Sequence, residues 1–191
     1  MNKIATIAGL AVAATALTAS ADVLLSVDLS VTNEITVSAV DGNASTSASA
    51  SVFTGFLLAG FFSPADAGNG PGIADGVGNL STANNASDLG PSIFNGGTSV
   101  GLNIWNFSSD STVSVTGGTQ AFSGSATWTV DGAAYAAALA GNVSGDIYFG
   151  ADTDDDLPFS TNIGTWEVKI PAPGSMALLG MGGIFAGRRR R

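Results

Sequence analysis

Apolar and polar residues alternate with a period of two in several short segments of the chain. From Val23 to Val31, every odd position is apolar. In residues 122–130, Phe122, Trp128 and Val130 share one face, and only Ser and Thr stand at the positions between. Such alternation is typical of strands with one buried face. The pattern therefore predicts an all-β protein.

The remaining segments extend this prediction from residue 22 to residue 170. Gly, Asn and Asp turns separate the segments, so we expect an antiparallel β-sandwich, jelly-roll-like in form. The Ala-rich residues 132–140 fit either a short helix or a strand. Residues 63–98 are dense in Gly, Asn, Ser and Pro, and a long loop is expected there, either flexible or ligand-binding. Further strands are expected at residues 35–39, 51–62, 99–107, 112–115, 143–149 and 165–170.

Residues 1–21 have the features of a secretory signal peptide. Lys3 supplies the positive start, and an Ala-rich apolar run follows from Ile4 to Leu17. Ala19 and Ala21 are small residues at the two positions that signal peptidase inspects. A first transmembrane helix is the alternative, but the apolar run is short. We therefore expect cleavage after Ala21.

Residues 171–191 combine three features in order. Pro171-Ala172-Pro173-Gly174 precedes an uncharged apolar run, Ser175 to Gly187, and Arg188, Arg189, Arg190 and Arg191 follow. As a helix, the thirteen residues of the run would extend about 20 Å, which is shorter than the ~30 Å hydrocarbon core of a bilayer. The arginines would keep their end on the cytoplasmic side. These features predict a temporary membrane stop rather than a permanent anchor.

This tail resembles the PEP-CTERM sorting signal of Gram-negative bacteria. That signal joins a Pro-Glu-Pro-like motif, a short apolar transmembrane helix and an Arg-rich end, and here Ala172 replaces the central Glu. The resemblance implies processing by an exosortase-type membrane peptidase, after transient residence in the inner membrane. It also implies a final location at the cell surface or in the extracellular matrix, in association with exopolysaccharide and biofilm.

Composition excludes several classes of function. Residues 22–170 carry fifteen acidic residues and one base, Lys169, which gives a formal charge of −14. Nucleic-acid binding requires cationic phosphate contacts, so we expect no nucleic-acid partner. The chain has neither cysteine nor histidine. Disulfides, thiolate metal sites and catalytic triads that contain either residue are therefore impossible within it.

An acidic cluster and three tryptophans are the candidate binding groups. Asp152, Asp154 and Asp156 have the spacing of the first half of an oxygen-ligand calcium loop, although the rest of an EF-hand pattern is missing. The cluster is either a calcium site or a solvated turn. Trp128 and Trp166 lie on apolar strand faces and are expected in the core. Trp105 is the better candidate for an exposed sugar-binding platform.

Together these features predict an exported, non-enzymatic cell-surface or matrix protein that requires no cofactor. The expected partners are signal peptidase, an exosortase-like peptidase and exopolysaccharide. Glu34 and Glu167 are the only glutamates, and nothing in the sequence pairs them as a glycosidase would require. The alternative function is a carbohydrate- or calcium-binding β-sandwich module.

Overall fold

The computed structural model describes residues 22–169, and it confirms the all-β prediction. One α-helix, α1 (Gly132–Ala140), and one 3-10 helix, η1 (Asp154–Phe159), interrupt the strands. The strands are β1 (Val23–Asp28), β2 (Glu34–Ala39), β3 (Ala48–Ser51), β4 (Phe56–Leu58), β5 (Ala74–Asp75), β6 (Val77–Gly78), β7 (Ser81–Thr82), β8 (Ser92–Phe94), β9 (Leu102–Trp105), β10 (Thr112–Val115), β11 (Phe122–Ser123), β12 (Ser125–Thr129), β13 (Ser144–Phe149) and β14 (Thr161–Val168).

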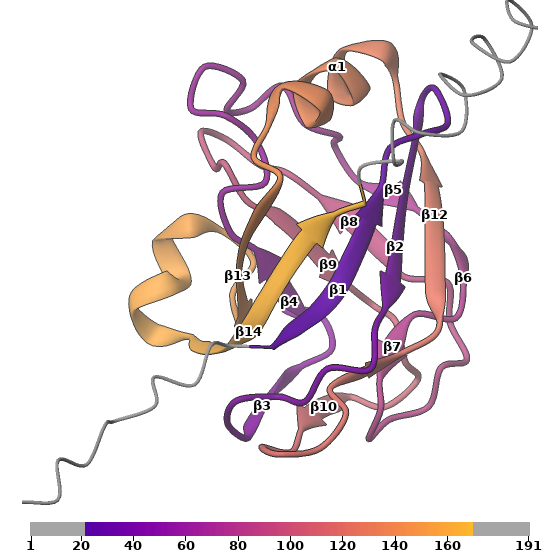
Figure 1. Ribbon diagram of the computed structural model, residues 1–191, viewed down its shortest axis with the longest axis vertical. Coiled ribbons are helices and arrows are strands. Elements are labelled where there is room, and N and C mark those ends of the chain that lie inside the picture. The colour runs from indigo at the N-terminus through magenta and orange to yellow at the C-terminus, as the bar shows by residue number, and fades with distance from the viewer. Residues whose placement is uncertain (1–21, 170–191) are drawn as a thin grey trace, which may run out of the picture.

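Ten strands form one sheet that nearly closes on itself (Figure 1). The order is β5-β8-β9-β4-β13-β14-β1-β2-β12-β6. The two edge strands, β5 and β6, are consecutive in the chain and are separated only by Gly76. This short segment therefore pairs with β8 on one side of Gly76 and with β12 on the other. The result is a barrel-like arrangement, with β3–β10 and β7–β11 as two additional two-stranded sheets.

The prediction of one uninterrupted loop at residues 63–98 was wrong. The segment contributes four short strands, β5 to β8, and three of them belong to the large sheet. Its side chains also enter the core, where Leu80 and Ile93 are fully buried. Strands of two or three residues are too short to show a period of two, so composition alone suggested a loop.

One strand pair departs from the antiparallel pattern. β1 runs parallel to β14 and antiparallel to β2. The β1–β14 register shifts between Val23 and Leu25, so Leu24 is an extra residue in the ladder. Leu24 and Leu25 are both fully buried, although the alternation had placed them on opposite faces. The irregularity explains how adjacent residues both reach apolar surroundings.

Aromatic side chains fill much of the core. Trp128 and Trp166 have no exposed surface, as expected from the sequence. Phe56 lies 4.7 Å from Phe122 and 5.6 Å from Phe107, measured between ring centroids. Such tilted aromatic pairs add about 0.5–1.5 kcal/mol each beyond the area they bury. Strands distant in the chain are therefore joined by a continuous apolar interior.

The Ala-rich segment resolves as helix α1. The Asp131 side chain accepts a hydrogen bond from the Ala134 N–H at 2.8 Å, which caps the first turn. Ala134, Ala137 and Ala138 are buried against the core. The helix covers one end of the sheet, and β3 and β10 lie at the other end (Figure 1).

Two carboxylates tie the segment before β8 to the turn before β10. Asp88 accepts hydrogen bonds from the Ser109 hydroxyl at 2.6 Å and its N–H at 2.9 Å. Asp110 accepts one from the Asn85 side-chain amide at 2.9 Å. These bonds hold the pKa of both carboxyls below their ordinary value near 3.8. Their contribution to stability is present above about pH 4 and is lost as the pH falls through the lowered pKa values.

We therefore expect the melting temperature of the double variant Asp88→Asn/Asp110→Asn to fall less on acidification than that of the wild type. Calorimetry between about pH 5 and pH 2.5 measures the difference. The control is Asp41→Asn/Asp155→Asn, which removes two exposed carboxylates elsewhere. Parallel melting curves for the wild type and the Asp88/Asp110 variant over this range would contradict the assignment.

Candidate functional site

A hollow with aromatic walls lies on the outer face of the sheet, over the β8–β9 pair. Its volume is about 180 Å³. Phe53 and Ile73 are unusually exposed for large apolar residues, at 67% and 69%. The lining residues are Phe53, Ile73, Phe94, Asn103, Trp105 and Asp152.

Strand register places the two central aromatic residues on the same face. Ser92 pairs with Trp105, and Phe94 pairs with Asn103. The intervening pair, Ile93 and Ile104, is fully buried on the core side. Because side chains alternate along a strand, Phe94 and Trp105 must point away from the core. Both are half-buried, so their rings line the hollow and remain partly accessible.

The third aromatic residue comes from the turn between β3 and β4. The Thr54 and Gly55 N–H groups both donate to the Ser51 carbonyl, at 3.1 and 3.0 Å. Gly55 has a φ of +65°, and a Cβ atom there would lie 2.1 Å from the Ile104 carbonyl oxygen. Only glycine fits this close approach. The turn therefore holds Phe53 beside the end of β9.

Asn103 supports the hollow from beneath. It is only 2% exposed, and its side-chain amide donates to the carbonyls of Thr54 at 2.8 Å, Phe56 at 3.2 Å and Ala151 at 3.2 Å. Thr54 follows Phe53, and Ala151 precedes Asp152. One buried amide thus fixes the backbone next to two lining residues, which preorganises the hollow.

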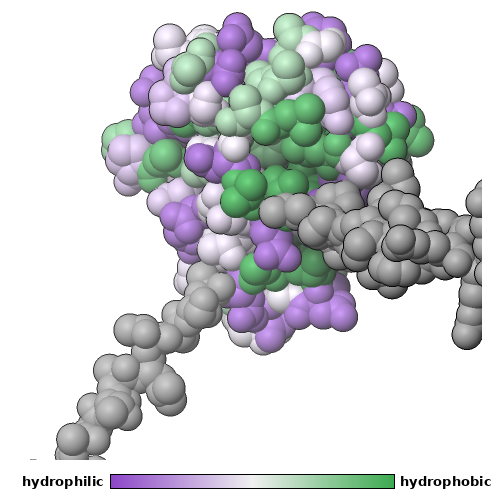
Figure 2. Space-filling model, turned by 45° about the horizontal axis from the view of Figure 1, so that its top comes forward, coloured by the Kyte–Doolittle hydropathy of each residue, from purple (hydrophilic) through white to green (hydrophobic). Residues whose placement is uncertain are grey.

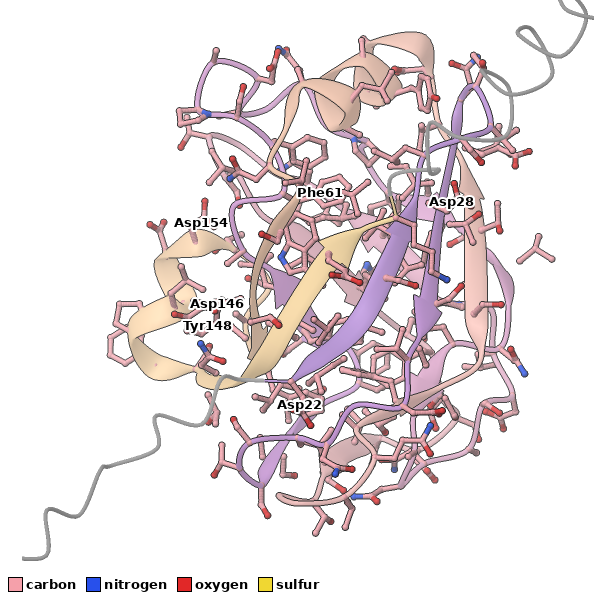
Figure 3. All side chains as sticks on the ribbon, viewed as in Figure 1. Asp22, Asp28, Phe61, Asp146, Tyr148 and Asp154 are labelled. Carbon is pink, nitrogen blue, oxygen red and sulfur yellow. The ribbon has the colours of Figure 1, made fainter. Side chains whose placement is uncertain are left out.

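A polar cleft of about 380 Å³ adjoins the hollow, and Phe94 lines both. Asp154, on the η1 side of the molecule in Figure 3, accepts a hydrogen bond from the Val100 N–H at 2.7 Å through Oδ2. Its other oxygen, Oδ1, is buried and has no hydrogen-bond partner among the described residues. A buried carboxylate oxygen without a partner is costly, so the cleft favours a ligand that donates a hydrogen bond.

The structure brings together only two of the three proposed calcium ligands. The hydrogen bond to Asp156, partial burial and the neighbouring charge raise the pKa of Asp152, whereas this hydrogen bond lowers the pKa of Asp156. Asp154 instead accepts a hydrogen bond from the Val100 N–H. Within residues 22–169, no group of three or more acidic residues is placed to hold a metal ion. The carboxylates of Asp152, Asp154 and Asp156 therefore do not converge as the calcium hypothesis required.

Of the three tryptophans, only Trp105 reaches the hollow, in agreement with its selection as the exposed candidate. Sequence reasoning missed Phe53, Ile73 and Phe94 as its companions. Chemically, the site combines flat apolar faces with carboxylate acceptors. Those are the groups that a sugar ring requires, since one face of the ring is apolar and its hydroxyls donate hydrogen bonds.

The expected sorting features lie outside the described residues. These are Ala19 and Ala21 of the signal peptide, the Pro171-Ala172-Pro173-Gly174 motif and the arginines at 188–191. Between residues 22 and 169, the structure contains no helix with the length and apolar character needed to cross a membrane.

In comparisons with known proteins, no family model, no curated protein and no solved structure matches this chain.

Proposed function

We propose that this chain is an exported, non-enzymatic surface or matrix protein, sorted through its PEP-CTERM-like tail. The observation that carries the proposal is the fit between the folded domain and the two sequence signals. β1 begins at Val23, directly after the expected new N-terminus at Asp22, and β14 ends at Val168, just before Pro171. Removal of both signals would leave the described strands complete.

Asp22 itself participates in the fold, which further supports cleavage at its N-terminal side. Its carbonyl accepts a hydrogen bond from the Thr165 N–H at 3.0 Å, and its carboxylate accepts one from the Asn43 N–H at 3.1 Å. A cut further along the chain would remove these contacts of Asp22 with β14 and with the turn after β2. Export, inner-membrane retention and release by an exosortase-like peptidase then follow in order.

Mass spectrometry of the native mature protein tests the proposal. We expect an N-terminus at Asp22 and the absence of Arg188–Arg191. Ala21→Arg should block the first cleavage because it places a large charged residue at the cut site, whereas Ser20→Leu should leave it unchanged. Mature protein that retains residues 1–21, or that keeps the four arginines, would contradict the proposal.

A second candidate function, carbohydrate binding, is favoured by the aromatic hollow. Trp105, Phe94 and Phe53 offer stacking surfaces, and Asp152 and the unpartnered Asp154 oxygen offer acceptors. The charge of −14 over residues 22–169 repels anionic polymers, so neutral glycans are the better ligands. A glycan array, run with and without calcium, should show calcium-independent binding to neutral saccharides. Binding only to anionic glycans in calcium would argue against this ligand class.

A further inference from the structure

An apolar groove of about 290 Å³ lies at the α1 end of the domain and shares no lining residue with the aromatic hollow. Leu29, Ala138 and Val168 form part of its lining, and two further lining residues are largely exposed, Leu139 at 57% and Val143 at 58%. Figure 2 turns this end forward and shows hydrophobic residues gathered on it. Exposed aliphatic side chains that cluster in this way mark a surface that meets an apolar partner.

The charges around the groove differ from those of the rest of the domain. Helix α1 has no charged residue, and its Ala133, Ala136, Leu139 and Ala140 are exposed. Lys169 is the only basic residue among residues 22–169, and it is the only charged residue that lines the groove. Asp28 lies close enough to interact with Lys169, and Asp131 stands at the helix N-cap. Although residues 22–169 are strongly acidic, no acidic residue lines the groove.

The groove also lies where the chain continues toward its tail. Lys169 lines it, and the apolar run of the tail begins at Ser175, six residues later. Six residues span at most about 20–22 Å even when fully extended. Any tail that holds Ser175 at the membrane boundary therefore keeps the α1 end within that distance of the bilayer. Asp22 lies at the other end of the β1–β14 pair, away from Asp28 (Figure 3).

We propose that the α1 end is a lipid-facing surface, which rests on the bilayer interface while the tail holds the precursor in the membrane. This inference depends on the sorting function proposed above. Leu139 and Val143 would enter the interfacial region, and the Lys169 ammonium would meet lipid phosphates while its stem covers apolar surface. The domain would then be held in one orientation, with the β3–β10 end away from the membrane.

The test uses residues 22–191, the form that remains once the signal is removed, with vesicles of phosphatidylcholine. Because the chain has no cysteine, single cysteines can carry an environment-sensitive fluorophore. The test position is Leu139→Cys, and the control is Thr46→Cys, an exposed residue before β3. We expect the label at 139 to shift to shorter wavelength and to be quenched by lipids brominated in their acyl chains. The label at 46 should show neither effect.

The possible outcomes distinguish failure of this inference from failure of the sorting function on which it depends. Vesicle flotation of both labelled proteins tests the tail, and failure to float would overturn the sorting proposal together with this inference. Flotation without any change at position 139 would overturn the inference alone. A wavelength shift without quenching by brominated lipid would also overturn it, because protein, from the tail or a second copy, would then cover the groove.

Discussion

Replacing Trp128 with Ala should lower the free energy of unfolding by about 3–5 kcal/mol, the usual cost of truncating a fully buried aromatic residue. Trp128 has no exposed surface, and its indole N–H donates to the Pro91 carbonyl at 2.7 Å. The same carbonyl accepts the Gly76 N–H at 2.8 Å. The side chain therefore supports the point where the sheet closes. Since domains are stable by only about 5–15 kcal/mol, this loss is severe.

Chemical denaturation of two further variants separates the contribution of the buried ring from that of the hydrogen bond to Pro91. Trp128→Phe keeps an aromatic ring and leaves the Pro91 carbonyl one partner, so a loss of about 1–2 kcal/mol is expected. Trp105→Ala makes an aromatic-to-alanine change at a half-buried position and should cost about 1 kcal/mol. If Trp128→Ala were no more destabilising than Trp105→Ala, the closing role of Trp128 would be wrong.

The sequence revealed the long strands but not how the sheet closes. Residues 125–129 alternate cleanly, and they form β12 with Ala126 and Trp128 buried. Gly76 shows what alternation cannot detect. A Cβ atom there would lie 2.4 Å from the Trp128 indole nitrogen and 2.7 Å from the Pro91 carbonyl oxygen. That requirement arises from contacts between segments distant in the chain, and no local pattern encodes it.

The same limit applies to the candidate site. Trp105 could be selected because its strand pattern was ambiguous. Phe94 becomes its neighbour only through the register of β8 and β9, and Phe53 only through the turn before β4. The calcium hypothesis for the acidic cluster was wrong for a local reason. η1 begins at Asp154, and a 3-10 helix turns by about 120° per residue, so side chains two positions apart diverge. Spacing that suits a calcium loop therefore gave no convergence here.

Replacing Trp105 with Ala should weaken binding to the preferred neutral saccharide by roughly thirty-fold, which corresponds to about 2 kcal/mol. The ring is the largest stacking surface in the hollow, and Asn103 anchors the backbone beside it through the Thr54 and Ala151 carbonyls. The loss should therefore come from the missing aromatic face, with the remaining walls in place. Titration calorimetry with the saccharide identified on the array measures it.

Phe159→Ala is the matched control, because Phe159 is 90% exposed on η1 and does not line the hollow. It should bind as the wild type does, whereas Trp105→Phe should keep most of the affinity because a flat aromatic face remains. Asp154→Asn replaces the carboxylate that carries the unpartnered oxygen with an amide, and it should weaken binding without removing any stacking surface. Equal affinities for Trp105→Ala, Phe159→Ala and the wild type would exclude the hollow as the saccharide site, since truncating its central ring would then have removed no contact with the ligand.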